Sequence, residues 1–171
     1  MEIFNELIGV EFNDLFKQLD MLIINFGENI THSLHVNCFV RIISGDKILL
    51  TSSDEYFLKD GTHKTEEDFK KEEEKGIIAD KHSLLAANIK AVKKLLRNRK
   101  VLRIDTTLNA DLFISFDNGV VIQIMPDCIA KSYEYYRFIK FEPHWNEDFD
   151  KFKSSHFVVR SEAGNITGVW E

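Results

Sequence analysis

The sequence predicts an α+β fold: a mainly antiparallel, hairpin-linked β-sheet of about seven to nine strands, with an N-terminal helix and one central amphipathic helix packed on a face. Three observations favour it. Segments that alternate polar and apolar residues recur along most of the chain, short turns separate them, and one stretch near the middle has helical spacing instead. The 171 residues include 14 phenylalanines, which is ample core material for one domain spanning residues 1–171.

The first third of the chain predicts a short helix followed by strands. Residues 3–8 place four apolar side chains on one helical face, whereas residues 12–19 fit either a helix or a strand. Residues 20–27, DMLIINFG, read as a strand that ends at its glycine. Residues 35–54, HVNCFVRIISGDKILLTSSD, predict one strand, a tight SGD turn and a second strand, which together make a hairpin.

The next segment is almost wholly polar. Residues 59–75 contain a single aromatic side chain, Phe69, and we expect residues 59–79 to be an exposed charged loop or insert, with a solvated helical turn through Glu66–Glu74. Helical spacing then predicts the central helix over residues 81–98. Asp80 is the first candidate for its N-cap, and Ser83 is the competing one.

The last third predicts a series of strands. Asp117-Asn118-Gly119 separates two alternating runs and favours a type I′ turn, because both asparagine and glycine tolerate a positive φ. Further strand patterns follow in YEYYRFIKF and SHFVVRS, and a final one in ITGVW. No repeat and no break in composition marks a second domain.

The row of polar side chains in the first hairpin raises a functional question. His35, Asn37 and Arg41 alternate with apolar residues, together with Phe39. A half-buried strand places such a row toward water, so the structural interpretation is the outer face of a hairpin. The alternative is an enzyme whose site lies around His35, Asn37 and His156.

Motifs for known chemistry are absent from the sequence. It has no HExxH, CxxC, GxSxG, P-loop or GxGxxG, so we expect no enzyme, no catalytic residue, no cofactor and no metal. Cys38 and Cys128 lie in strand-like apolar surroundings and read as reduced, buried thiols. No signal peptide or membrane span is visible, which favours the cytoplasm.

A basic cluster lies at the end of the central helix. Seven cations and no acid occur among its charged residues: Lys90, Lys93, Lys94, Arg97, Arg99, Lys100 and Arg103. Such a cluster suits phosphate groups, and a small regulatory or nucleic-acid-associated module is one hypothesis. Cations also gather at helix C-termini to meet the helix dipole. The net charge of −6 and the lack of interleaved aromatics disfavour nucleic acid.

Acidic and aromatic residues form the other functional pattern. Acidic residues end the first hairpin and recur near the tyrosines and a tryptophan of the C-terminal third. Negative charge speeds the encounter with a basic protein, and aromatic rings supply buried anchors. The composition therefore indicates a protein-binding surface for a basic partner.

The order of several segments resembles that of small bacterial immunity-type proteins of polymorphic toxin systems. The resemblance lies in HVNCFVRI, GDKILL, Asp54-x-Tyr56, DLFISFDNGVVIQIMPD, Glu134-x-x-Arg137-Phe138 and HFVV, over residues 20–160 without the charged segment. It implies a protein that binds and blocks a cognate toxin domain rather than an enzyme. Polar residues in these segments must pair when half-buried, for instance Glu134 or Asp54 with Arg41 or Arg137.

Pattern and resemblance together predict a set of partner-binding residues. These are Asp54, Glu55, Tyr56, Tyr133, Glu134 and Tyr136.

Overall fold

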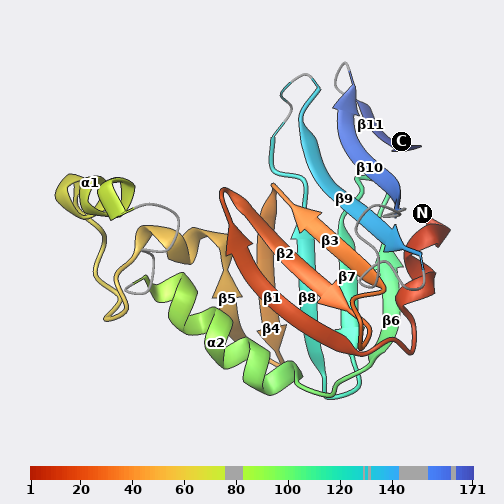
Figure 1. Cartoon of the computed structure of the whole chain (residues 1–171), viewed down its shortest axis with the longest axis horizontal. Helices are drawn as coiled ribbons and strands as arrows, with labels where there is room; N and C mark the ends of the chain where they lie inside the picture. The colour runs from red at the N-terminus through yellow and green to blue at the C-terminus, as the bar shows by residue number, and fades with distance from the viewer. Residues whose placement is uncertain (76–82, 129, 131, 143–153, 163–164) are drawn as a thin grey trace.

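The described residues build two antiparallel β-sheets that face each other (Figure 1). The computed structural model describes residues 1–75, 83–128, 130, 132–142, 154–162 and 165–171. Their eleven strands confirm the α+β class with mostly antiparallel sheets. The eleven strands exceed the expected seven to nine. The expected hairpin is present but begins only at residue 39, because the chain changes sheets inside residues 35–54.

The larger sheet has six strands in the order β1-β2-β3-β9-β10-β11. Its strands are β1 (Phe12–Gln18), β2 (Met21–Phe26), β3 (His32–Val36), β9 (Glu134–Phe141), β10 (Ser154–Glu162) and β11 (Asn165–Trp170). Residues 12–19, which fitted a helix or a strand, are therefore a strand. All neighbouring strands run antiparallel, and the strands expected at the C-terminal end are confirmed.

The second sheet has five strands in the order β5-β4-β8-β7-β6. These are β4 (Phe39–Ser44), β5 (Lys47–Thr51), β6 (Val101–Thr106), β7 (Leu112–Phe116) and β8 (Val120–Met125). The β7–β8 hairpin is confirmed, but its turn is not type I′. Gly119 has φ 80° whereas Asn118 has no positive φ, and the Gly119 amide donates to Phe116 O at 3.0 Å. That is a three-residue loop with its glycine in the left-handed region.

The change of sheet occurs at Asn37 and Cys38. β3 ends at Val36 in the six-stranded sheet, and β4 begins at Phe39 in the five-stranded sheet. Val36 and Val40 are both buried, so the inward alternation continues through the break. For this reason the hairpin formed by this segment is only β4–β5, and His35 and Arg41 lie in different sheets.

The apolar core lies between the two sheets and is closed on both sides by helices. The 3-10 helix η1 (Glu2–Leu7) contacts β6 and inserts Phe4, which is fully buried against rings of β9 and β10. On the other side the helix α2 (Leu84–Leu96) contacts β1 and β5. The expected central helix is thus confirmed, but it bridges the edge strands of both sheets.

The start of α2 and the charged segment before it also differ in part from expectation. Ser83 Oγ accepts a hydrogen bond from Ala86 N at 3.0 Å and is the N-cap, whereas Asp80 lies outside the described residues. The expected helical turn is the helix α1 (Glu66–Lys75). Residues 59–75 are not simply an exposed loop, since Lys64 is only 5% exposed and pairs with Glu72 at 2.9 Å. Residues 76–79 are not among those described.

Candidate functional site

A β-bulge in β9 organises the outer face of the six-stranded sheet. Val159 of β10 pairs with Tyr136, and the next residue, Arg160, pairs with Glu134, so Tyr135 is an extra residue in β9. Residues three apart in a regular strand point to opposite faces, but the bulge places Glu134 on the same face as Arg137. A bulge of this kind re-aims a side chain, and here it creates an ion pair.

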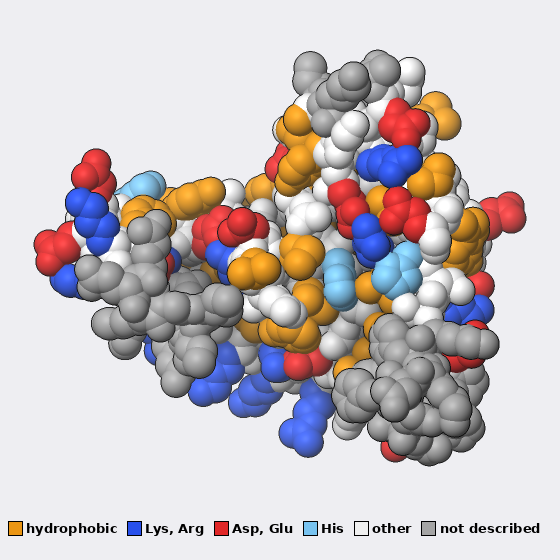
Figure 2. Space-filling view, turned by 45° about the horizontal axis from the view of Figure 1, so that its top comes forward, with side chains coloured by type: hydrophobic (Ala, Val, Ile, Leu, Met, Phe, Trp, Pro, Cys, Tyr) orange, Lys and Arg blue, Asp and Glu red, His pale blue; other side chains and the backbone are white. Residues whose placement is uncertain are grey.

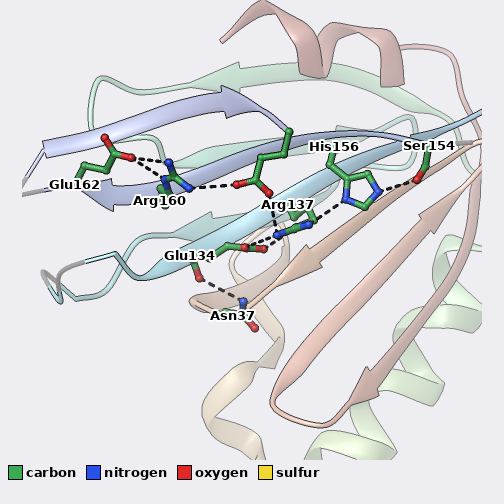
Figure 3. A network of polar contacts seen from close by, with 8 residues as sticks. Asn37, Glu134, Arg137, Ser154, His156, Arg160 and Glu162 are labelled. Carbon is green, nitrogen blue, oxygen red and sulfur yellow. Dashed lines mark hydrogen bonds and ion pairs between the residues drawn. The ribbon is translucent and has the colours of Figure 1, made fainter.

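The pair between Glu134 and Arg137 is bidentate and lies at the centre of Figure 3. Arg137 Nε donates to Glu134 Oε1 at 3.0 Å, and Arg137 Nη2 donates to Glu134 Oε2 at 2.8 Å. The two side chains remain 27% and 28% exposed. This confirms one of the pairings expected from the sequence. The carboxylate also raises the pKa of the Arg137 guanidinium by hydrogen bonding, so its charge is secure.

Further polar residues extend this pair across β10 to Glu171, the residue that follows β11 (Figure 3). Arg137 Nη2 lies 3.4 Å from Glu171 Oε2, and Arg160 Nη1 lies 3.2 Å from Glu171 Oε1, so this one carboxylate bridges two guanidinium groups. Arg160 also pairs with Glu162 at 2.7 Å. We call the whole set the β9 network: Asn37, Glu134, Arg137, Ser154, His156, Arg160, Glu162 and Glu171.

His156 has a defined tautomer within the β9 network. Arg137 Nη1 lies 3.0 Å from His156 Nδ1, and because arginine can only donate, Nδ1 must accept. The Nε2 atom of neutral His156 then carries the hydrogen and donates to Ser154 Oγ, 2.7 Å away. In this state the ring cannot take the hydroxyl proton of Ser154 as a general base.

Two more groups join the face from the two connections between the sheets, Asn37 from β3–β4 and Tyr133 from β8–β9. Asn37 Nδ2 donates to Glu134 O at 3.3 Å, and Tyr133 Oη donates to Asn37 O at 2.7 Å. Burial is the main cause of a raised pKa for Tyr133. His35 lies directly across from Arg137 in the sheet. The structure therefore brings His35, Asn37 and His156 to one region.

The predicted contacts in the 3-10 helix η2 (Ser52–Tyr56) lie in a different element beside α2. Asp54 accepts from Thr51 N at 3.0 Å and from Asn88 Nδ2 at 2.8 Å. Glu55 is paired with Lys17 of β1. Tyr56 remains 48% exposed, and its ring lies 6.4 Å from that of Phe69 in α1. We call Asp54, Glu55 and Tyr56 the η2 corner.

Tyr136 requires a correction. Its side chain is fully buried between the sheets, and its hydroxyl donates to Ala110 O at 2.8 Å. Burial strongly raises the pKa of this hydroxyl. A side chain with no exposed surface offers nothing to a partner, so Tyr136 leaves the set of expected contacts and belongs to the core.

The structure also decides the pairing expected for Arg41 and the state of the two cysteines. Arg41 lies in β4 and donates through Nε to Gln123 Oε1 at 2.7 Å, so it pairs with neither of the expected acids. Both cysteines are free, with Cys38 buried and Cys128 partly buried, and burial raises the pKa of the Cys38 thiol. Among the described residues no group of histidine, cysteine and acidic side chains is arranged to hold a metal ion.

Several members of the β9 network were not predicted. Ser154, Arg160 and Glu162 come from a strand that was expected and Glu171 follows another, but nothing in their sequence context set them apart. The alternation in residues 154–162 is the one usable signal, since it places the even-numbered polar residues on a common face. Figure 2 shows acidic, basic and histidine side chains gathered over β9–β11.

In the described part of the chain, no helix has the length and apolar character needed to cross a membrane. Comparisons with models of protein families, with curated proteins and with solved structures give no match.

Proposed function

We propose that this chain is an immunity-type protein that binds and neutralises a cognate bacterial toxin domain by one-to-one protein contact. The observation that supports this most is the β9 network itself. Its charged side chains come from β9, from β10 and from the residue after β11 and are held by one another, yet Glu134, Arg137 and Glu171 keep between 27% and 40% of their surface exposed. A surface that is ordered before binding loses less conformational entropy when a partner docks.

The residue types on this side of the molecule suit a basic partner. The β9 network has three carboxylates and two guanidinium groups, and the whole chain carries a net charge of −6. Arginine, tyrosine and tryptophan dominate the energetics of protein interfaces. In addition to the arginines, two aromatic side chains are exposed. Trp170 on β11 is 53% exposed, and Tyr56 in the separate η2 corner is 48% exposed.

Blocking requires only that the bound partner lose access to its own substrate. Complementary charge accelerates encounter, and buried aromatic anchors slow dissociation. If the toxin acts on nucleic acid, its cleft is basic and fits this surface. The proposal needs no cofactor and no turnover, and it makes the chain act in proportion to the amount of toxin.

Co-expression with the C-terminal domain encoded by the neighbouring reading frame tests the proposal. We expect a one-to-one complex that survives gel filtration, and rescue of cell growth. Two variants separate the two surfaces: Glu171→Lys in the β9 network and Tyr56→Ala in the η2 corner. At least one should weaken binding by tenfold or more, since interface anchors each contribute about 2 kcal/mol or more.

Leu108→Ser provides the control, because Leu108 is fully exposed on the turn that follows β6, in the five-stranded sheet. It should leave the dissociation constant unchanged in isothermal titration calorimetry. The absence of any complex with that domain at micromolar concentration, or binding that none of the three variants alters, contradicts the proposal or the surface assigned to it.

A further inference from the structure

A cleft of about 720 Å³ lies on another side of the molecule, between the second half of α2 and the ends of β1 and β2. Lys93, Lys94 and Arg97 line it from the helix, and Glu11 and Glu28 line it from the sheet. Its size is in the range of about 300–1,000 Å³ that small-molecule sites occupy. Figure 2 shows basic side chains along the lower edge of the molecule, where α2 lies.

The sheet wall of this cleft is fixed by hydrogen bonds. Asn13 is an extra residue in β1, where the pairing with β2 shifts register. Its side-chain amide donates to Gly27 O at 2.8 Å and to Glu28 O at 3.2 Å. Gly27 has φ 84°, a conformation that glycine adopts without strain. The turn that carries Glu28 is therefore held against β1 before any ligand arrives.

The charges around the cleft are not all used by the fold. Lys93 pairs with Asp14 at 2.5 Å, and Glu11 lies 3.8 Å from Lys100. Within the described residues, by contrast, the side chains of Lys94, Arg97 and Glu28 make no ion pair or hydrogen bond. Two cations and one carboxylate thus face the same cleft without a protein partner.

The helix terminus does not engage these two cations in hydrogen bonds. Cations near a helix C-terminus can serve its last carbonyl groups. Here Leu95 O accepts from Asn118 Nδ2, and Leu96 O accepts from Arg99 N, both at 3.0 Å. Two of the last carbonyls therefore already have donors that are neither Lys94 nor Arg97. Both basic side chains remain available to an anion from solution.

We propose that this cleft binds a small phosphate monoester that also carries hydroxyl groups, such as a sugar phosphate. Arg97 and Lys94 would hold the phosphate, since guanidinium and ammonium groups are its usual partners in proteins. The carboxylate of Glu28 would accept hydrogen bonds from hydroxyl groups at the other side of the cleft. This site is independent of the β9 network and of the toxin-binding proposal.

Titration of the full chain with ribose 5-phosphate, followed by calorimetry and by amide NMR shifts, tests the site. Ribose and inorganic phosphate are titrated separately, and ribose 5-phosphate should bind more tightly than either. Arg97→Gln and Lys94→Gln should each weaken both phosphate-containing ligands by about tenfold, as expected for one lost charge-assisted hydrogen bond. Glu28→Gln should weaken ribose 5-phosphate and leave inorganic phosphate unchanged.

Lys47→Gln is the matched control, because Lys47 is an exposed lysine at the start of β5 that does not line the cleft. It should change nothing. All four changes lie at the surface, and circular dichroism is recorded to check that each variant folds. Failure of ribose 5-phosphate to bind overturns the proposal, as does binding that is insensitive to Arg97 and Lys94. Preferential binding of a single-stranded RNA oligomer through the same residues overturns it in favour of a polynucleotide site.

Discussion

Arg137 shows what a single side chain does on this surface. It donates to Glu134 on β9 and to His156 on β10, and it forms an ion pair with Glu171, which directly follows β11. Ion pairs this exposed contribute only about 0–1 kcal/mol each to stability, because water and salt screen them. The value of the arrangement is geometric, since one planar guanidinium fixes two carboxylates and an imidazole where a partner can reach them.

The histidines make stability depend on pH. Burial is the first cause of a lowered pKa for His32, His35 and His156, and the nearby Arg137 charge lowers it further for His35 and His156. As the pH falls, the histidines of the unfolded chain take up protons near their ordinary pKa of 6.5, whereas those of the folded chain do so only at lower pH. Stability is therefore full above about pH 6.5 and is lost as the pH falls through the folded-state values.

We expect the free energy of unfolding, measured with urea, to be lower at pH 5 than at pH 7.5. Glu6 also has a lowered pKa, mainly through its hydrogen bond with Lys140, but its contribution is lost only below its ordinary value of 4.5. The His156→Gln variant should show a smaller decline between the two pH values. A free energy of unfolding that stays level or rises toward pH 5 contradicts the lowered pKa values of these histidines.

At the scale of elements, β-bulges account for most of what the sequence could not predict. Phe12 and Leu15 are both buried, three residues apart, because the extra residue Asn13 shifts the register of β1. That spacing is also helical, which is why residues 12–19 fitted either structure. The bulge at Tyr135 likewise brought Glu134 and Arg137 together, although regular alternation separates them.

Elements with regular periods were predictable. The central helix and the β7–β8 hairpin follow from spacing and turn residues alone, because no bulge disturbs them. The change of sheet at Asn37 was not predictable, because inward and outward positions alternate without interruption on both sides of it. The candidate site shares this limit, since residues from different strands meet there only through the pairing of β3, β9, β10 and β11.

The N-cap of α2 gives a prediction for this element. Ser83→Ala removes the hydroxyl that accepts from Ala86 N, and it should lower the free energy of unfolding by about 1 kcal/mol. Ser83→Gly is the comparison, because glycine at an N-cap costs only a few tenths of a kcal/mol. Urea unfolding of the three proteins measures the difference. A glycine variant that is less stable than the alanine variant contradicts this reading of the cap.

At the scale of the whole molecule, backbone hydrogen bonds and a shared apolar core join the two sheets. Backbone hydrogen bonds join the start of β1 to the start of β6: Phe12 N donates to Arg99 O at 2.8 Å, and Val101 N donates to Val10 O at 3.0 Å. One apolar cluster contains residues of both sheets and of both closing helices. The β9 network lies on the outer face of the six-stranded sheet, and we expect its order to depend on this packing.

Phe4 in η1 provides a test of whether the two sheets are held together by the packing between them. Phe4 lies on a short helix that contacts β6, and its ring packs at 5.5–5.9 Å from the rings of Tyr136, Phe138 and Phe157 in the opposite sheet. Phe4→Ala should lower the free energy of unfolding by about 3–5 kcal/mol, because it leaves a cavity that rigid strands cannot fill. Far-ultraviolet and near-ultraviolet circular dichroism should still report one coincident transition.

Ile8→Ala tests whether this effect comes from the junction, because Ile8 immediately follows η1 and is 49% exposed. It should change stability by no more than about 0.5 kcal/mol. If Phe4→Ala costs no more than this control, η1 does not hold the sheets together. If the near-ultraviolet transition instead precedes the far-ultraviolet one, packing between the sheets is lost before the strands themselves unfold, and the two sheets do not behave as one cooperative body.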